Sequence, residues 1–202
     1  MSILLVLIDD FSWDRKLNIR TAGSDYSEMN KADYGYDPPP YSVLCRLAES
    51  GYIRKEDVLV DFGCGKGRVS FYLNHTLGCR VIGIDCNAKR LRAAAENLRR
   101  YVNGADITFT LARAEEYTIT EGNCFYFFNP FSGDVFQKVL SNIKAYQDSS
   151  LIPVRIFFYY PTSEYRFYFE REKRLLLTDE IDCTGLFSND KSVYRILVFK
   201  IV

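Results

Sequence analysis

The amino-acid sequence predicts an α/β fold, namely a doubly wound, mostly parallel seven-stranded sheet with a C-terminal antiparallel hairpin and helices on both faces. Three features predict it. Short apolar runs alternate with helical patterns from residue 57 onward, a glycine-rich loop follows the first run, and the alternation ends in two β-rich runs near the C-terminus. Strands that alternate with helices and are buried on both faces are typical of parallel sheets.

The expected elements follow one another in a regular order. Three prolines at positions 38–40 precede apolar residues at helical spacing, which predict a helix ending near Gly51. The next elements are a strand at 58–60, a helix at 69–77, a strand at 80–85, a helix at 88–102, strands at 107–111 and 124–128, a helix at 135–143 and a strand at 155–160. The runs at 175–181 and 194–202 flank a polar loop, and this pattern predicts the hairpin.

The size and composition of the chain suit one α/β domain. A length of 202 residues is ordinary for a single domain, and 48% apolar residues suffice for a continuous core. Lys plus Arg and Asp plus Glu both number 26, so no overall basic charge attracts DNA or RNA, although a local basic patch stays open. We expect an N-terminal arm or lid over residues 1–36, one domain over residues 37–202 and no dedicated nucleic-acid-binding module.

The cysteines and the first apolar run bear on the location of the protein. The six cysteines form no C-x-x-C pair and no zinc-site spacing, which indicates free thiols in a reducing compartment and no metal site. The run from Ile3 to Ile8 ends at Asp9 and lacks a basic start, so we expect neither a signal peptide nor a membrane span there. A cytoplasmic protein without a membrane partner is the expectation.

The chemistry is expected at the loop D-F-G-C-G-K-G-R, residues 61–68, which follows a strand and precedes a helix. Its glycines let the backbone approach a ligand closely, and the helix start aims amide N–H groups at that ligand. A dinucleotide fingerprint counted from Gly63 needs a glycine where this chain has Arg68. The carboxylate of Asp61 repels a pyrophosphate but suits an ammonium or sulfonium group. The loop therefore favours a cationic amino-acid nucleoside over a dinucleotide.

The loop resembles the first motif, D-x-G-x-G-x-G, of the class I S-adenosylmethionine-dependent methyltransferases, and the resemblance covers residues 37–202. It implies a Rossmann-like methyltransferase domain whose cofactor is S-adenosyl-L-methionine, with the glycine loop beneath the methionine part. It also implies an acid at the end of the second strand that binds the two ribose hydroxyls, and Asp85 is that acid. The alternative role of Asp85 is to cap the helix that starts near Ala88.

The same resemblance implies a set of cofactor-binding residues. In the family, residues just after the third strand contact the adenine, which here implies the backbone of Ala114 and the side chain of Glu115. A solvated acidic turn is the alternative reading of that stretch. The complete set is Asp61, Gly63, Cys64, Gly65, Gly67, Asp85, Cys86, Ala114, Glu115 and Asn129.

The acceptor site is expected at F-F-N-P-F, residues 127–131, at the end of the fourth strand. This segment resembles the N-P-P-F/Y motif of enzymes that methylate planar amino or amide nitrogens, although it has only one proline. In those enzymes the asparagine side chain and a proline carbonyl accept hydrogen bonds from the acceptor nitrogen, and the aromatic ring stacks on it. The expected catalytic residues are Asn129, Pro130 and Phe131. The alternative is a simple turn at the strand end.

The predicted function is in-line methyl transfer from S-adenosylmethionine to an acceptor that the sequence does not identify, with nitrogen favoured. Such a reaction depends mainly on orientation and on the exclusion of water, so the single histidine, His75, receives no role. The alternative is a non-catalytic S-adenosylmethionine-binding partner or sensor module. A small molecule, a protein or an RNA stays open as the acceptor, and the oligomeric state stays open too.

Three tyrosines, Tyr34, Tyr36 and Tyr41, surround the proline run. In related methyltransferases the segment before the first strand often folds over the cofactor. We therefore expect residues 24–41 to cover the cofactor and to shape the acceptor pocket. A packing arm or a dimer contact is the alternative.

Overall fold

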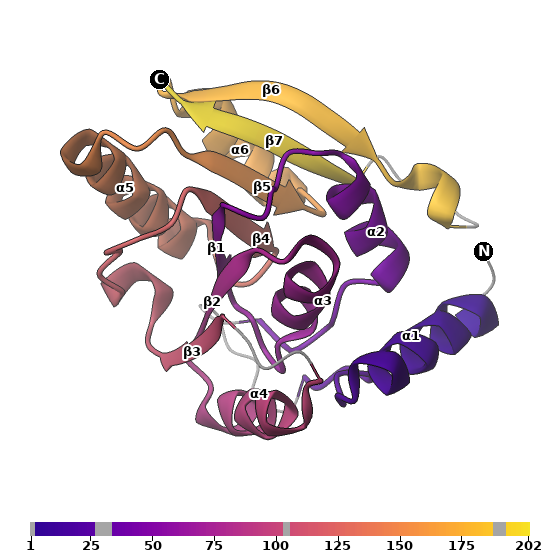
Figure 1. Ribbon diagram of the computed structural model, residues 1–202. Helices are drawn as coiled ribbons and strands as arrows, with labels where there is room; N and C mark the ends of the chain where they lie inside the picture. Colours follow the sequence, from indigo (N-terminus) through magenta and orange to yellow (C-terminus); the bar gives the residue numbers. More distant parts are fainter. Residues whose placement is uncertain (1–2, 27–33, 103–105, 188–192) are drawn as a thin grey trace.

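The computed structural model describes residues 3–26, 34–102, 106–187 and 193–202, and within them one sheet of seven strands (Figure 1). The strands are β1 (Val58–Phe62), β2 (Arg80–Asp85), β3 (Ile107–Leu111), β4 (Cys124–Phe128), β5 (Arg155–Tyr159), β6 (Leu175–Asp182) and β7 (Arg195–Ile201). Their spatial order is β3-β2-β1-β4-β5-β7-β6. The first five strands pair in parallel, and β7 runs antiparallel to both β5 and β6. The predicted fold class, including the C-terminal hairpin, is confirmed.

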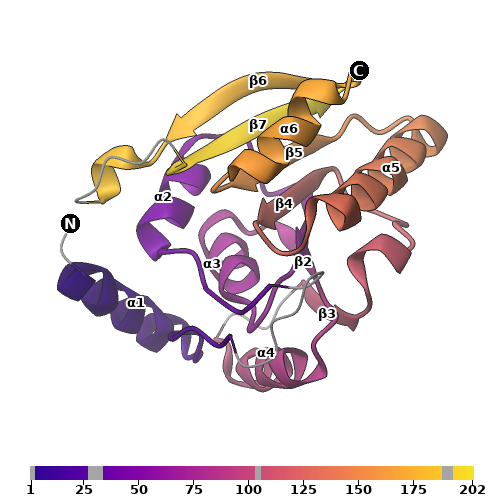
Figure 2. The ribbon, with the colours of Figure 1, turned by 180° about the vertical axis from the view of Figure 1, so that it is seen from behind.

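The helices cover both faces of the sheet. They are α1 (Ile3–Leu17), α2 (Tyr41–Glu49), α3 (Arg68–Leu77), α4 (Ala88–Arg100), α5 (Gly133–Ser150) and α6 (Ser163–Arg171). Figures 1 and 2 show α2 and α3 on one face and α5 and α6 on the other. Helix α1 packs against α2 and α3 on the outside of their layer. Of the arm expected over residues 1–36, residues 1–2 and 27–33 lie outside the described part of the chain.

Two helices were not expected from the sequence, and each has a physical explanation. The apolar run that begins α1 is continuous, and periodicity cannot distinguish such a run from a strand. Helix α6 is short and aromatic, which is a composition more typical of strands. Its Tyr165 and Phe169 are four residues apart and therefore share one helical face, where both contact Phe158. Tertiary packing of that face stabilises the helix.

The alternation of side chains along β1 determines where its acid points. Leu59 is buried in the core beneath α2 and α3, whereas Val60 and Phe62 are buried in the core beneath α5 and α6. Because successive side chains of a strand point to opposite faces, Asp61 lies on the side of α3. The strand order reverses between β1 and β4, and open α/β sheets bind ligands at the carboxyl ends of strands beside such a reversal.

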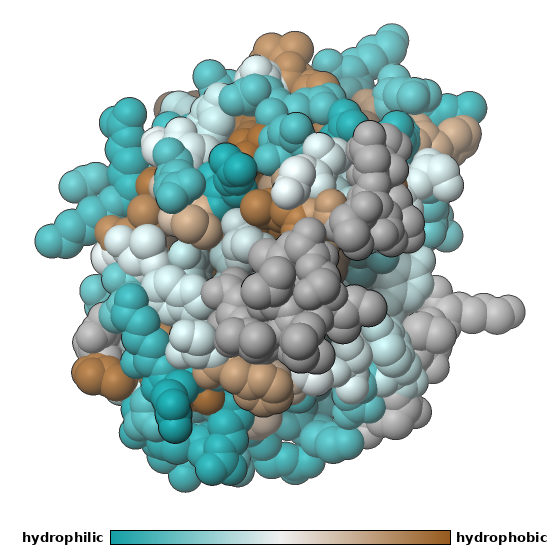
Figure 3. Space-filling view, turned by 90° about the vertical axis from the view of Figure 1, so that its right-hand side faces the viewer, coloured by the Kyte–Doolittle hydropathy of each residue, from teal (hydrophilic) through white to brown (hydrophobic). Residues whose placement is uncertain are grey.

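The surface is mixed in character. In Figure 3, hydrophobic residues on the visible face form separate patches between hydrophilic ones, which is ordinary for a folded domain. Among the described helices, none is both long and apolar enough to cross a membrane.

Candidate functional site

A cavity lies at the carboxyl ends of β1, β2 and β4, where the fold predicts ligand binding. Most of the residues expected to bind the cofactor or the acceptor line it, namely Asp61, Gly63, Cys64, Gly65, Asp85, Cys86, Ala114, Glu115, Pro130 and Phe131. Two expected residues, Gly67 and Asn129, do not line this cavity. The tertiary structure thus brings these residues together from four separate parts of the sequence.

Gly67 instead serves the turn into α3. Its φ of +90° is in the left-handed region, and it is the residue immediately before the helix. A Cβ atom there would lie 2.7 Å from Phe71 and 2.8 Å from Phe109, which is closer than real contacts allow. Glycine is therefore required at position 67 by backbone conformation and by packing.

The carboxylate of Asp85 joins β2 to the glycine loop. The backbone N–H of Gly65 donates to its Oδ2 at 2.9 Å, and the backbone N–H of Asn87 donates to its Oδ1 at 2.8 Å. The cap of α4 is Asn87, whose side chain accepts hydrogen bonds from the backbone of Lys89 and Arg90. The alternative that Asp85 caps this helix is therefore wrong. Asp85 is buried and lines the cavity.

Asp61 is a buried acid at the same edge of the sheet. It is 2% exposed, and the Ser70 hydroxyl donates a 2.8 Å hydrogen bond to its Oδ2. Burial, together with the negative charge of Asp85 and against the lowering effect of the Ser70 hydrogen bonds, raises the pKa of Asp61 to about 7. The carboxyl group therefore exchanges its proton near neutral pH, and a cationic ligand group beside it would favour the ionised form.

Two side chains that the sequence reasoning missed present buried polar atoms to the cavity. Tyr126 lies beside Asp61 in the parallel register of β4 and β1 and is 1% exposed. Its hydroxyl group and the Nη2 atom of Arg68 are both buried without a hydrogen-bond partner among the described residues. Both side chains line the cavity. Unpaired buried polar atoms are costly, so both are positions where a ligand would gain hydrogen bonds. The one hydroxyl group in the run C-F-Y-F-F was the available signal for Tyr126.

The wall near β3 is more apolar. Ile84, Ala112, Ala114 and Phe131 line it. Glu115 lies in a short 3₁₀ turn, where Arg113 holds its carboxylate at 2.9 Å, so the acid is engaged within the protein. Among the cysteines, burial raises the pKa of Cys64 well above its ordinary value, which leaves the thiol protonated.

The segment after β4 divides between two cavities. Pro130 and Phe131 line the first cavity, and the Pro130 carbonyl accepts a 3.4 Å hydrogen bond from the backbone N–H of Tyr34. Asn129 has a φ of +42° and lines a second cavity of about 630 Å³. Its Oδ1 atom is buried without a hydrogen-bond partner among the described residues.

The N-terminal segment covers the glycine loop. The ring of Tyr36 packs so closely on Gly65 that a Cβ atom there would lie 2.4 Å from the ring. The Tyr36 hydroxyl donates to the backbone oxygen of Thr21 at 2.6 Å. The first cavity consequently measures about 70 Å³.

Comparisons with known proteins agree with this geometry. Residues 59–145 match the family model described as a methyltransferase domain. A protein-lysine N-methyltransferase of Saccharolobus islandicus is 29% identical over 66 residues, which are 32% of this chain and 41% of that protein. The H3 lysine-79-specific histone-lysine N-methyltransferase of Dictyostelium discoideum is 38% identical over 60 residues, which are 30% of this chain and 3% of that protein. The matches thus span less than half of either relative.

A solved structure shares the whole architecture. The RNA methyltransferase from Salinibacter ruber, in complex with S-adenosyl-L-homocysteine, superimposes with a TM-score of 0.53 at 18% identity. The superposition covers 82% of this chain and 94% of that one. At this identity the likeness shows the fold. Residues 59–145 thus match a methyltransferase domain, and the strand order with the glycine loop at the switch point gives the chain a Rossmann-like methyltransferase fold.

Proposed function

We propose that the protein is an S-adenosylmethionine-dependent methyltransferase that transfers a methyl group in line to a nitrogen atom of its acceptor. One observation carries the proposal. The cavity at the switch point presents a buried acid, Asp61, and an unpaired guanidinium nitrogen of Arg68 to the same space. An acid and a guanidinium group are the natural partners of the ammonium and carboxylate groups of an amino acid.

The other residues of the cavity fit the rest of the cofactor. A carboxylate such as that of Asp85 is a natural hydrogen-bond acceptor for vicinal hydroxyl groups, and the apolar side chains of Ile84, Ala112 and Phe131 suit a purine ring. When bound, S-adenosylmethionine supplies an electrophilic methyl group on a sulfonium centre. The chain's own part is to orient the two reactants and to exclude water, which geometry alone accomplishes to a large extent.

The acceptor is proposed to be a nitrogen because of Asn129. Its Oδ1 atom, which has no hydrogen-bond partner among the described residues, can accept a hydrogen bond from an N–H group of the methyl acceptor. The two curated relatives are both named lysine N-methyltransferases, and this supports a nitrogen acceptor here.

Binding of S-adenosylhomocysteine, measured by calorimetry, tests the cofactor assignment. Asp85→Ala should weaken binding at least tenfold, since hydrogen bonds to a charged group contribute about 1.5–3 kcal/mol. Asp148→Ala is the matched control, because Asp148 pairs with Arg174 on the surface. Unchanged affinity of the Asp85 variant would refute the assignment. Tight binding without label transfer from methyl-labelled cofactor to any lysate fraction would indicate the non-catalytic module instead.

We also propose that residues 24–26 and 34–41, the described part of the segment expected to cover the cofactor, form a lid over it. The close packing of Tyr36 on Gly65 supports this role. Hydrogen exchange of residues 34–41 should slow when S-adenosylhomocysteine is added, because a closed lid protects its amides. Exchange that is unchanged by the ligand would favour the alternative of a packing arm.

A further inference from the structure

The second cavity lies beside the first and has a distinct character. The two cavities share Gly35, Asp37, Pro38 and Phe128. Seven aromatic residues line the second one, namely Tyr26, Tyr34, Phe128, Tyr159, Tyr160, Phe187 and Tyr194. They come from the N-terminal segment, from the ends of β4 and β5, and from the connection between β6 and β7. An acceptor in this cavity would therefore be adjacent to a cofactor in the first cavity.

The charges of this cavity favour a cation. Its described lining residues include Asp10 and Asp37 but no Lys or Arg. Asp10 is paired with the buried Arg68 at 2.7 Å, so its charge is largely compensated. Asp37 is exposed, and the Ser24 hydroxyl donates to it at 2.7 Å. Aromatic faces attract cations, and a nearby carboxylate adds to that attraction.

The arrangement of the rings favours a rounded group over a flat one. Phe128 and Tyr159 lie 4.7 Å apart at 42°, and Tyr159 and Tyr160 lie 6.1 Å apart at 66°. Tyr160 and Tyr194 meet at 54°, whereas Phe187 and Tyr194 stack at 24° with their centroids 4.0 Å apart. A purine or an amide stacks between parallel faces, whereas rings inclined to one another surround an ammonium group.

Two residues that line the same cavity have an unusual backbone conformation. Among the described residues, four other than glycine have a positive φ, and two of them line this cavity: Asn129 at +42° and Tyr160 at +58°. A tyrosine rarely adopts this conformation, because its Cβ atom is crowded there. Such strain persists only where the surroundings enforce it, and it concentrates at functional sites. The two strained residues directly follow β4 and β5 and orient one polar and one aromatic side chain.

We infer that this cavity binds the acceptor as an aliphatic amine, with the inclined rings around the ammonium group and Asn129 Oδ1 accepting one of its N–H groups. The inference rests on the proposed function, because it names the substrate class of that site. A lysine side chain and a free small amine share this chemistry.

The transfer step balances with groups already present. The ammonium group first loses a proton to water, so that the neutral amine is the nucleophile. The nitrogen lone pair then forms the N–C bond while the C–S bond breaks and its electron pair stays on sulfur. The product is a methylated ammonium group beside a neutral thioether.

Choline binding tests the aromatic cavity without any cofactor. Choline should bind at least tenfold more tightly than 3,3-dimethylbutanol, which has the same shape without the charge. Tyr194→Ala should weaken choline binding about fivefold, whereas Tyr194→Phe should preserve it, because the ring face is the proposed contact. Phe167→Ala is the matched control, since Phe167 is exposed on α6 and does not line the cavity.

Equal affinity for choline and its neutral isostere would overturn the inference. That result leaves the binding of S-adenosylhomocysteine unaffected, so it is distinguishable from a failure of the proposed function. Labelled cofactor would then be offered with a lysine-containing peptide, with free aliphatic amines and with RNA. Label in the peptide or in the amine supports the inference and identifies the source, whereas label only in RNA refutes it.

Discussion

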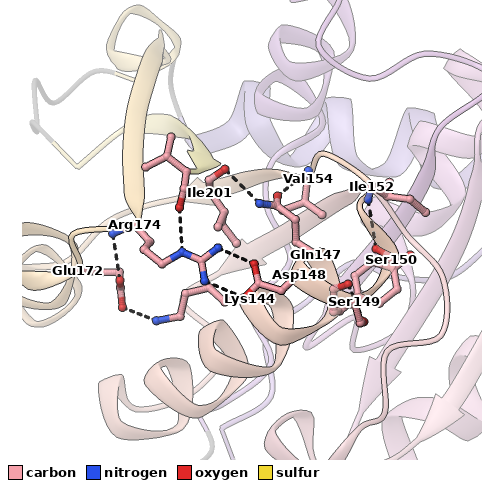
Figure 4. A network of polar contacts seen from close by, with 12 residues as sticks. Lys144, Gln147, Asp148, Ser149, Ser150, Ile152, Val154, Glu172, Arg174 and Ile201 are labelled. Carbon is pink, nitrogen blue, oxygen red and sulfur yellow. Dashed lines mark hydrogen bonds and ion pairs between the residues drawn. The ribbon is translucent and has the colours of Figure 1, made fainter.

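Two arginines of this protein make ion pairs in opposite surroundings. The Arg68 side chain is 1% exposed and lies 2.7 Å from Asp10, with further hydrogen bonds to Thr21 at 2.9 Å and to the Pro39 carbonyl at 3.2 Å. The Arg174 side chain is 39% exposed and makes two parallel hydrogen bonds to Asp148, at 2.7 and 2.9 Å (Figure 4).

The Arg174–Asp148 pair has the better hydrogen-bond geometry but contributes less to stability. A two-pronged contact on the surface is weakened by water and salt, and exposed pairs contribute about 0–1 kcal/mol. A buried pair gains little as a pair, but removing one partner leaves the other charge without solvation, at a cost of about 3–5 kcal/mol. Arg68 is the first residue of α3, directly after the glycine loop, and its side chain joins this helix to the N-terminal segment. The comparison teaches that burial, more than bond geometry, decides which ion pair positions the site.

The largest effect is expected for Arg68→Met. It should lower the free energy of unfolding by about 3–5 kcal/mol, because Asp10 would stay buried without its partner. Urea denaturation followed by circular dichroism measures this. A loss of unfolding free energy no greater than that of Arg174→Met would contradict the conclusion that burial decides which ion pair matters.

The next largest effect is expected in the pH dependence of stability, and it concerns Asp61, a buried acid that makes no ion pair with an arginine among the described residues. Its raised pKa means that the folded state retains a proton that the unfolded state loses above about pH 4. The associated stability is present below pH 4 and is lost as pH rises through about 7, by about 2–4 kcal/mol at roughly 1.4 kcal/mol per pKa unit. Asp61→Asn should therefore be less sensitive to pH over this range.

Urea denaturation at pH 5 and at pH 8 measures this difference. Asp148→Asn is the matched control, because the hydrogen bond from Arg174 lowers the pKa of Asp148, so this carboxylate stays ionised in both states between pH 5 and pH 8 and its substitution should leave the pH slope unchanged. Identical pH slopes for the wild type and for Asp61→Asn would contradict the prediction. If Asp61 meets the cationic end of the cofactor, affinity for S-adenosylmethionine should also rise as pH rises through about 7.

The smallest effect is expected for Arg174→Met. The substitution should cost less than about 1 kcal/mol and should cost still less in 1 M salt, because exposed charges are screened. Denaturation at low and high salt measures it. A loss near that of Arg68→Met would show that the network of Figure 4 contributes more than its exposure implies.

The sequence alone predicted the acids of the site from their local context. Asp61 is the last but one residue of β1 and Asp85 the last of β2, and strand ends of a parallel sheet meet at one edge, so their convergence followed from the pattern. Gly67 was expected at the cofactor because it belongs to the motif, yet its neighbours Phe71 and Phe109 give it a packing role. Arg68 had served only to exclude a dinucleotide, and its burial was invisible in the sequence.

What the sequence by itself determined is the succession of strands and helices along the chain, apart from α1 and α6, and therefore the edge at which ligands bind. These depend on hydrophobic periodicity and turn chemistry, which are local. Only the tertiary structure decided that Tyr36 covers Gly65, that Arg68 is buried against Asp10, and that Tyr126 faces the cavity. It alone assembled the aromatic cavity from three distant segments. Such contacts depend on how layers pack, because a side chain's surroundings are set by residues far away in the chain.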